Sequence, residues 1–510
     1  MRTSGILMPI FSLPSPHGIG NFGKEAYRFI DFLSDAGQTL WQILPMNPTD
    51  YGNSPYQSPS SFAGNPFFID PDALVEEGLI TEFELSLFDF GSDHRSVDYD
   101  KLIESRPKML ALAHGRFRGG EEYEKFCREN AYWLDDYVLF MALKDVTKDS
   151  PFNAWDAPLR DRDPKALAEA REKYADKCDF HSFVQFCFYK QWSALKKYAN
   201  EKGVYILGDI PIYVAYDSAD VWSDPAEFWL DKNLTPCAVG GCPPDAFSVD
   251  GQMWGNPLYR WNEMKKDGYA WWKKRLGFAL KIYDAVRIDH FRGLESYFAI
   301  PYGDKNAKNG FWKKGPGMSF FREMRKEFGE DLPIVAEDLG YLTPAVLKLL
   351  KDTGFPGMKV LQFAFDGRPD NEYLPHNHVK NCVVYTGTHD NNTILGWCEN
   401  AAEAEVKLAR EYLRANETEA FNWTMMRAAM MSVADTCILT MQDLSALSSE
   451  ARTNEPATVG KNWEWRIEGG YINSWLSRIT REMTELYGRL SPAYLARIEA
   501  EKETEKEGME

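Results

Sequence analysis

The chain has 510 residues, of which 44% are hydrophobic and 26% charged, an ordinary composition for a globular protein with an ample core. Its 58 lysines and arginines are outnumbered by 76 aspartates and glutamates, so the formal net charge is −18. This negative balance argues against nucleic acid or an anionic membrane as the main partner and favours a neutral substrate. Aromatic residues make up 14% of the chain, and although core packing accounts for most of them, their ring faces also offer surfaces for sugars.

The N-terminal residues 1–9 contain a short apolar run that is interrupted by Pro9, unlike a signal peptide. No stretch approaches the roughly 18 apolar residues of a membrane-spanning helix. The eight cysteines are scattered without a CxxC motif, as is typical of reduced thiols. The sequence therefore predicts a cytoplasmic protein.

In chain order, eight segments have the pattern of buried strands, and most of them are followed by a helical pattern. The expected strands are 5–11, 39–46, 204–214, 285–291, 334–340, 358–365, 382–390 and 436–444. The expected helices are 24–36, 181–201, 268–282, 318–329, 343–353, 403–414, 417–434 and 471–487. Eight alternating units with polar strand ends predict an α/β fold, a closed (β/α)8 barrel of the TIM type. A doubly wound open sheet is the alternative, but it would usually carry a glycine-rich phosphate turn after its first strand, and none is present.

Two long insertions interrupt the predicted barrel domain, which is expected to span residues 1–495. The first insertion, 47–180, is expected to form a mostly helical subdomain. The second, 215–266, is expected to form a substrate loop, because long loops at the C-terminal face of a barrel usually build the site. Residues 496–510 are strongly charged and are expected to form a frayed tail. No room remains for a β-sandwich after the last helix.

Carboxylates stand at the ends of three predicted strands, at Asp289, Glu337 and Asp390. Each of them alone could be a helix cap or part of a structural ion pair. Because the parallel strands of one barrel end at the same mouth, the three side chains are expected to converge there. Cleavage of a glycosidic bond needs two such carboxyl groups with different duties, an ionised nucleophile and a protonated acid.

The neighbours of two of these carboxylates predict which duty each performs. Asp289 is flanked by Arg287 and Arg292, whose positive charges are expected to lower its pKa and keep it ionised, as a nucleophile requires. Glu337 follows three apolar residues and precedes Asp338, and both features are expected to raise its pKa, as a general acid requires.

The remaining polar residues at these strand ends have less specific signals. Asp390 and His389 could bind sugar hydroxyls close to the reacting carbon, whereas His290 is expected to be structural. The sequence contains no GxSxG, Walker, HExxH or EF-hand motif. A metal site of the enolase type is disfavoured, because arginine already flanks the first carboxylate. No metal and no cofactor are therefore expected.

Several segments resemble the 4-α-glucanotransferases of glycoside hydrolase family 77, also called amylomaltases or disproportionating enzymes: AVRIDHFRG, VAEDLG, THDNNT, SPYQSPSSFAGNP, PPDAFSVDGQMWGNPLYRW, QDLSAL and NWEWR. The resemblance runs from about residue 5 to 490. It implies a barrel without a C-terminal sandwich, α-1,4-glucan substrates and no cofactor. One departure lies at 452–458, where the family tends to read RMNxPGT and this chain reads RTNEPAT. This difference concerns the expected shape of the acceptor side and not the chemistry.

The same resemblance implies roles for individual residues. It makes Asp289 the nucleophile, Glu337 the acid/base and Asp390 the stabiliser of the transition state, while Asp209 matches a supporting position. The residues that it implies for substrate binding are Arg287, His389, Tyr56, Asp245, Phe247, Gln252 and Trp254.

The function implied is transfer of α-1,4-glucan segments from a malto-oligosaccharide or amylose to the 4-hydroxyl of an acceptor glucan or glucose. A retaining double displacement is expected, with the two catalytic carboxyl groups about 5–5.5 Å apart. Residues 240–257 and 47–66 are expected to keep water from the intermediate. The alternatives are an α-glucan hydrolase that uses the same three carboxylates and a non-catalytic glucan-binding protein.

Overall fold

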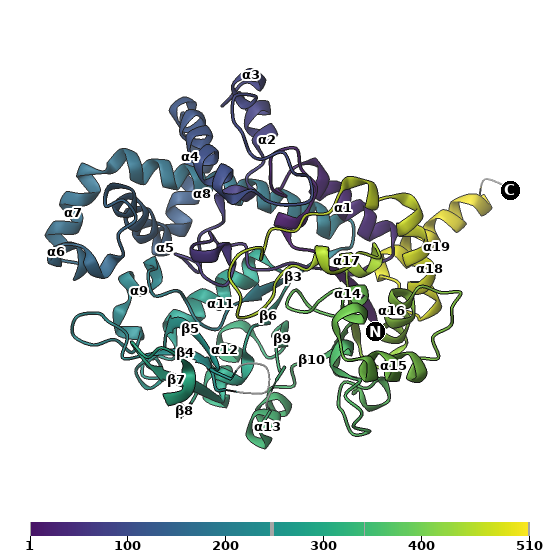
Figure 1. The fold of residues 1–510 in the computed structure, drawn as a ribbon. Coiled ribbons are helices and arrows are strands. Elements are labelled where there is room, and N and C mark those ends of the chain that lie inside the picture. The colour runs from purple at the N-terminus through teal and green to yellow at the C-terminus, as the bar shows by residue number, and fades with distance from the viewer. Residues whose placement is uncertain (1, 245–248, 341, 508–510) are drawn as a thin grey trace.

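The computed structural model describes residues 2–244, 249–340 and 342–507 (Figure 1). At its centre, eight strands form one parallel sheet: β1 (Thr3–Leu7), β2 (Leu40–Gln42), β3 (Tyr205–Ile210), β6 (Ala285–Ile288), β9 (Ile334–Ala336), β10 (Gly357–Val360), β11 (Cys382–Tyr385) and β12 (Thr436–Thr440). The hydrogen-bonded order is β10-β11-β12-β1-β2-β3-β6-β9, which is the order of these strands along the chain, taken cyclically.

The two edge strands of this sheet meet and nearly close it. The N–H of Ala336 in β9 donates to the carbonyl of Pro356, the residue before β10, at 2.9 Å. All eight predicted strands are present and the fold is a TIM-type (β/α)8 barrel, so that prediction is confirmed and the open sheet is excluded.

Both faces of the barrel strands are apolar, which explains why they were recognisable as buried parallel strands. One set of strand residues points inward and fills the barrel: Leu7, Leu207, Val335, Met358, Val360, Val383, Tyr385 and Ile438. The alternate residues, such as Ile6 and Ile206, belong to the larger core beneath the helices. A barrel filled in this way is not a pore, so its chemistry is confined to one end.

The helices around the barrel are α1 (Lys24–Asp35), α8 (Ala175–Glu201), α11 (Ala270–Ile282), α12 (Met318–Phe328), α13 (Pro344–Thr353), α14 (Ile394–Asn400), α15 (Glu403–Tyr412), α16 (Phe421–Met431), α17 (Met441–Leu444) and α18 (Ser474–Leu486). Every predicted helix has a counterpart among them. The connection from β10 to β11 departs from the ideal pattern, because it contains only the 3-10 turns Leu361–Phe363 and Pro375–Asn377.

Two of these helices begin shortly after the strand ends that carry candidate residues. The side chain of Thr343 accepts a hydrogen bond from the N–H of Val346, and Pro344 occupies the first position of α13. The side chain of Thr393 accepts from the N–H of Gly396 in the same way at α14. Threonine at the N-cap and proline at the first position are favoured starts of a helix, so the local sequence fixes where these loops end.

The predicted strands extend several residues too far at their C-terminal ends. The segment 5–11 leaves the sheet after Leu7 and forms the 3-10 turn Ile10–Ser12. The segment 285–291 leaves it after Ile288, and His290 adopts a left-handed backbone with φ 50°. After Leu7 the largely apolar residues 8–13 continue past the strand because this loop is also buried, so hydrophobicity does not mark the end of that strand.

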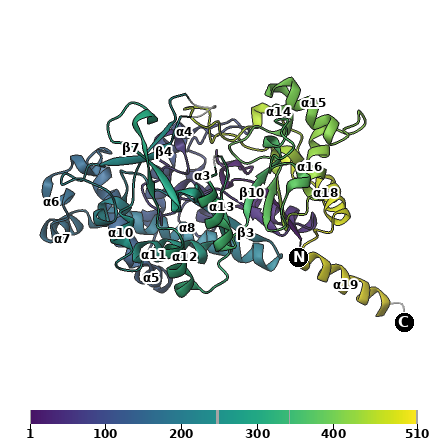
Figure 2. The same cartoon turned by 90° about the horizontal axis from the view of Figure 1, so that it is seen from below.

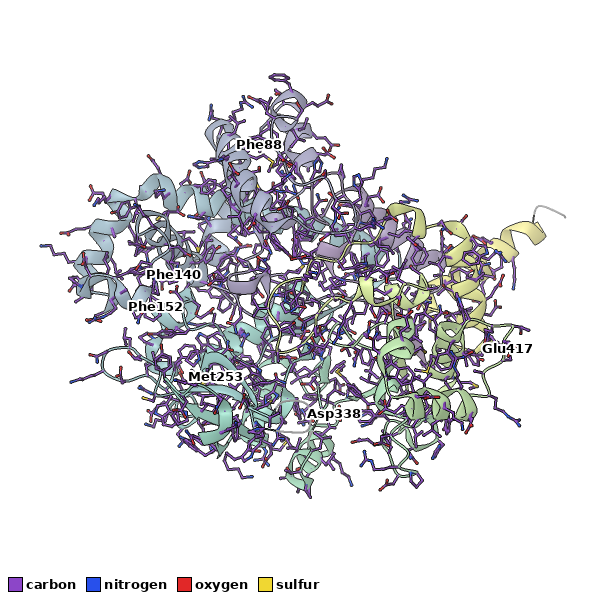
Figure 3. The ribbon with its side chains drawn as sticks, viewed as in Figure 1. Phe88, Phe140, Phe152, Met253, Asp338 and Glu417 are labelled. Atoms are coloured by element: carbon purple, nitrogen blue, oxygen red, sulfur yellow. The ribbon has the colours of Figure 1, made fainter. Side chains whose placement is uncertain are left out.

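The segment 47–180 contains the helices α2 (Pro71–Glu76), α3 (Glu82–Leu85), α4 (Tyr99–Arg116), α5 (Glu121–Val146), α6 (Ala157–Arg160) and α7 (Pro164–Lys173). These helices lie together beside the barrel (Figure 1). Phe140, which is labelled in Figure 3, is fully buried and packs against Trp155 and Trp222. Trp222 belongs to α9 (Ala219–Ser223), so the first insertion shares its core with the second.

A second, smaller sheet was not predicted. Its four antiparallel strands are β4 (Ala238–Cys242), β5 (Gln252–Pro257), β7 (Ser296–Pro301) and β8 (Phe311–Lys314), in the order β5-β4-β7-β8. Met253, labelled in Figure 3, lies on it. The sheet joins the expected loop 215–266 to a segment after β6, and pairing between such distant segments leaves no local signal.

The C-terminal segment also differs from its prediction. Instead of a frayed tail, residues Pro492–Glu507 form helix α19, which projects from the body of the molecule (Figure 2). Glutamate and lysine are good helix formers, so strong charge did not exclude a helix here. Within the part of the chain that the structure describes, no helix combines the length and apolar character needed to cross a membrane.

Candidate active site

The three candidate carboxylates stand in loops just beyond the C-terminal ends of β6, β9 and β11. The loops that carry Asp289 and Glu337 are in direct contact, since the N–H of His290 donates to Glu337 Oε2 at 2.7 Å. Asp390 is linked to them by a chain of contacts. His389 Nε2 lies 3.4 Å from Asp390 Oδ1 and 3.0 Å from the Tyr56 hydroxyl, which donates to Asp209, and Arg287 bridges Asp209 and Asp289. The predicted convergence at one barrel mouth is therefore present in the structure.

Arg287 is the buried cation of this site. Its Nη1 donates to Asp209 Oδ2 at 2.6 Å and its Nη2 to Asp289 Oδ1 at 2.8 Å. Asp209 stands opposite Arg287 in the register between β3 and β6. Tyr56 also donates to Asp209 Oδ2, at 2.7 Å. Asp209 is thus central to the site, although the sequence indicated only a supporting role; its signal was a single charge in an otherwise apolar strand.

Both oxygens of Glu337 accept hydrogen bonds from the main chain. Oε2 accepts from His290 and Oε1 accepts from Leu339, at 2.7 and 2.8 Å. Burial raises the pKa of Glu337 and Asp338 adds to the effect, while Arg287 and the two N–H groups lower it; the net shift is upward. This is the direction expected from its apolar neighbours and from Asp338.

The pKa of Asp289 does not follow its prediction. Burial raises it, and the carboxylates of Asp209, Glu337 and Asp390 add to the effect, whereas Arg287 lowers it; the net shift is upward. The prediction that arginine keeps this pKa low is wrong, because burial outweighs the lowering by Arg287. Because the charge of Glu337 is among the groups that raise the pKa of Asp289, the two carboxyl groups titrate together.

His389 and Tyr56 form an aromatic edge beside Asp390. Their rings are stacked with centroids 5.4 Å apart, and the Tyr56 hydroxyl lies 3.0 Å from His389 Nε2. Trp463 packs against both rings, at 5.9 and 6.0 Å. Burial lowers the pKa of His389, so the imidazole is neutral near pH 7 and suited to hydrogen bonding rather than to carrying charge.

Arg452 and Asn454 also reach Asp390, and neither was predicted as a site residue. Asn454 Nδ2 donates to Asp390 Oδ1 at 2.6 Å. Arg452 Nη2 donates to the main-chain carbonyl of Asp390 at 3.0 Å. The sequence RTN at 452–454 could have indicated these two residues, but this segment was connected with the acceptor side and not with Asp390.

Of the predicted residues in the second insertion, Gln252 and Trp254 lie on β5. The indole of Trp254 meets the ring of His290 edge to face at 4.8 Å, and its Nε1 donates to Gln252 Oε1. Trp254 therefore lies next to the residue that follows Asp289 in the chain. Asp245 and Phe247 lie outside the described residues.

Comparison with known proteins identifies the family. The family profile described as 4-alpha-glucanotransferase, of glycoside hydrolase family 77, matches residues 8–473. The chain belongs to the 4-alpha-glucanotransferase family. The 4-alpha-glucanotransferase of Clostridium butyricum is 46% identical over 486 residues, covering 94% of this chain and 100% of that protein. That of Streptococcus pneumoniae is 47% identical over 495 residues, covering 96% and 98%.

A solved structure agrees with this assignment. The amylomaltase from Streptococcus agalactiae in complex with acarbose has a TM-score of 0.93 and 41% sequence identity, covering 96% of this chain and 100% of that one. The family indicated by the sequence motifs is therefore confirmed, and the chain is an enzyme of the 4-alpha-glucanotransferase type.

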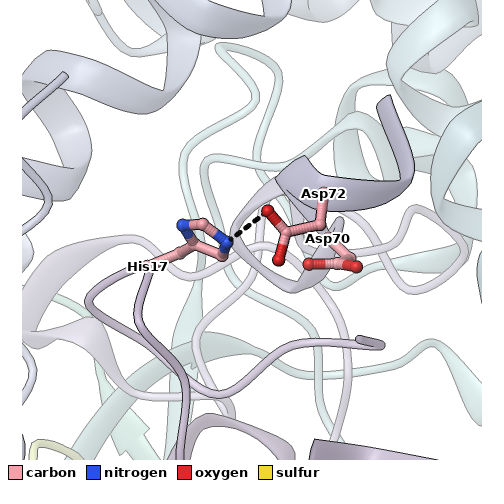
Figure 4. A group of neighbouring side chains, drawn as sticks. All are labelled: His17, Asp70 and Asp72. Atoms are coloured by element: carbon pink, nitrogen blue, oxygen red, sulfur yellow. Dashed lines mark ion pairs between the residues drawn. The ribbon is translucent and has the colours of Figure 1, made fainter. Parts of the chain in front are cut away.

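Among the residues that the structure describes, one cluster of metal-ligand type lies outside the carboxylate site of this 4-alpha-glucanotransferase. His17, Asp70 and Asp72 place ligand atoms within 4.8 Å of one another, and His17 Nε2 lies 3.1 Å from Asp72 Oδ1 (Figure 4). Burial raises the pKa of Asp70, and the guanidinium of Arg106 is among the groups that lower it. Arg106 therefore already places a positive charge near Asp70.

Proposed function

We propose that the enzyme transfers α-1,4-glucan segments by a retaining double displacement, with Asp289 as nucleophile and Glu337 as acid/base. The supporting observation is that the residue next to Asp289 donates its N–H to Glu337 Oε2 at 2.7 Å. This contact places the two carboxyl groups in adjacent loops. Retention expects them about 5–5.5 Å apart, whereas an inverting enzyme leaves about 6.5–9.5 Å for a water between them. Glu337, whose pKa is raised by burial, is the proposed source of the proton that the first step consumes.

In the first step Asp289 attacks the anomeric carbon of the donor while Glu337 protonates the leaving oxygen. The bond from the anomeric carbon to that oxygen breaks, and a bond to the Asp289 carboxylate forms. Asp390 and His389 bind sugar hydroxyls beside this carbon, and these bonds strengthen as positive charge develops on it.

In the second step Glu337, now ionised, takes the proton from the 4-hydroxyl of an acceptor glucan or glucose. The acceptor oxygen attacks the same carbon, the bond to Asp289 breaks, and the α-1,4 linkage is restored. Malto-oligosaccharides and amylose are the proposed donors. The three carboxylates and their hydrogen-bond partners suffice for every proton transfer, so the proposal needs no metal or cofactor.

The deciding test separates transfer from hydrolysis. The protein is incubated with maltotriose alone and the products are separated by chain length. Transfer predicts a ladder of longer maltodextrins together with free glucose. Glucose and maltose alone would favour the hydrolase, and absence of any product would favour a glucan-binding protein.

Transfer also requires that water be kept from the intermediate. Gln57 Nε2 donates to the carbonyl of Trp254 at 3.1 Å and lies 3.2 Å from Asn256 Oδ1, which ties the segment 47–66 to the loop 240–257. We predict that Trp254→Ala increases the ratio of hydrolysis to transfer, measured as reducing ends formed per transferred segment. Met253→Ala, on the neighbouring exposed position, serves as the control; an unchanged ratio in Trp254→Ala would show that the Trp254 side chain takes no part in water exclusion.

The pH dependence should report the Asp289–Glu337 pair. Activity needs one carboxyl ionised and the other protonated, so kcat/KM should fall when the pair gains a second proton and again when it loses its last one. Because burial raises both pKa values, both limbs should lie above those of exposed carboxyl groups. In Glu337→Gln, assayed with a donor that needs no protonation, the alkaline limb should disappear; its persistence would assign that limb to another group.

We also propose a cytoplasmic location. Its support is that the buried cysteines Cys187, Cys382 and Cys437 are free thiols. Reduced cysteines are typical of that compartment.

A further inference from the structure

Asp390 is held differently from the other two candidate carboxylates. Its side chain is 43% exposed, compared with 30% for Asp289, so burial alone does not fix its rotamer. His389 Nε2 lies 3.4 Å from Oδ1, and the shorter contact comes from the amide of Asn454, whose Nδ2 donates to the same oxygen at 2.6 Å. This amide belongs to a segment, residues 452–466, that we call the strap.

The strap also fixes the main chain on both sides of the Asp390 side chain. The N–H of Asn454 donates to the carbonyl of His389 at 3.0 Å. Arg452 donates to the carbonyl of Asp390 through Nη2 and to the carbonyl of Asn454 through Nε, at 3.0 and 2.8 Å. One arginine thus ties the donor residue and its acceptor residue together, and fixes the geometry of the amide–carboxylate bond.

The strap is anchored at two distant points. Gln442, just after β12, donates to Thr453 Oγ1 at 2.9 Å. Tyr99, at the start of α4, donates to the carbonyl of Trp463 at 2.9 Å. The strap therefore takes its position from both the barrel and the first insertion, and it transmits that position to Asp390.

We propose that Asn454 is a positioning residue for Asp390, with Arg452 as its support. This inference rests on the proposed function, in which Asp390 stabilises the transition state. A neutral amide suits the task, because it orients the carboxylate without neutralising the charge that must face the developing positive centre. The bond engages Oδ1, so Oδ2 can accept a hydrogen bond from a sugar hydroxyl.

The first test is the effect of Asn454→Ala and Asn454→Asp on transfer from maltotriose. The second substitution keeps the shape of the side chain but removes the N–H donor. A misplaced catalytic group can cost about 100-fold in rate, so we expect kcat to fall by about that factor in both variants with little change in KM. A loss confined to KM would overturn the proposal, because it would make Asn454 a substrate contact.

The second test asks whether the effect passes through Asp390. Asn454→Ala is combined with Asp390→Asn, and the residual activities of all four proteins are measured. If Asn454 acts by positioning Asp390, the second substitution should cost little once the carboxylate is gone, so the effects are far from additive. Additive losses would show that Asn454 acts independently and would overturn the inference.

The control is Thr458→Ala, which removes a hydroxyl that donates to the carbonyl of Glu455 at 2.7 Å in the same strap. It should retain wild-type kcat and the wild-type melting temperature. An equal loss in this variant would show that Asn454 is a general scaffold contact.

The activity of Asp390→Asn alone separates the two proposals. Full activity in Asp390→Asn would contradict the proposed function. An inactive Asp390→Asn together with a fully active Asn454→Ala would contradict only this inference.

Discussion

Replacing Asp289 by asparagine should lower kcat for transfer from maltotriose by at least about 10⁴-fold, because removal of a nucleophile leaves only binding and electrostatic contributions. Asparagine keeps the size of the side chain and can still accept from Arg287 Nη2, which donates to Asp289 Oδ1 at 2.8 Å. The barrel mouth should therefore keep its shape while the covalent step is lost. The measurement is the rate at which maltotriose gives longer chains and glucose.

The comparison for this prediction is Asp331→Asn, which changes an exposed aspartate just before β9. That variant should transfer glucan at the wild-type rate, and both proteins should melt at similar temperatures. Trapping the intermediate adds a second measurement, since a slow donor should leave a glucan covalently attached to the wild-type enzyme but not to Asp289→Asn. Retention of the product ladder in Asp289→Asn would mean that another residue is the nucleophile.

Replacing Glu337 by glutamine should have the second largest effect, and its size should depend on the leaving group. With maltotriose the leaving oxygen must be protonated, and loss of a general acid typically costs about 10²–10⁴-fold. With a glycosyl fluoride donor the departing fluoride needs no proton, so the first step should be largely restored. The measurement is the ratio of wild-type to variant rates for the two donors.

Glu330→Gln is the matched control, because Glu330 is 85% exposed and forms only a long contact with Arg325. It should behave as wild type with both donors. A loss in Glu337→Gln that is equal for maltotriose and the fluoride would contradict the acid role. It would point instead to disturbance of the main-chain contacts that Glu337 makes with His290 and Leu339.

Much of the fold could be predicted from the sequence because the relevant signals are local. A strand buried on both faces, such as Ile334–Ala336, is a continuous apolar run, and the first polar residue after it marks the barrel mouth. Asp289 and Glu337 were found in this way. Motifs at the same positions then indicated the family, which the comparisons confirm.

Features that depend on pairing between distant segments were not predictable in this way. The small sheet joins β4 and β5 to β7 and β8, and no residue in either segment indicates its partner. The strap segment was assigned to the acceptor side, because only folding brings Asn454 against Asp390, 64 positions earlier in the chain. The helix α19 was missed for another reason, since charge was taken as a sign of fraying although the same residues favour helix.

By itself, the sequence determined the barrel, the three strand-end carboxylates and the family, because each depends on residues close together in the chain. The tertiary structure decided how those carboxylates are charged and held. Arg287 lies two residues from Asp289 in sequence and lowers its pKa, yet burial and the neighbouring carboxylates, among them Asp209 from β3, outweigh that effect. Charge–charge energies depend on distance and burial, and both are fixed only when the strands close into a barrel.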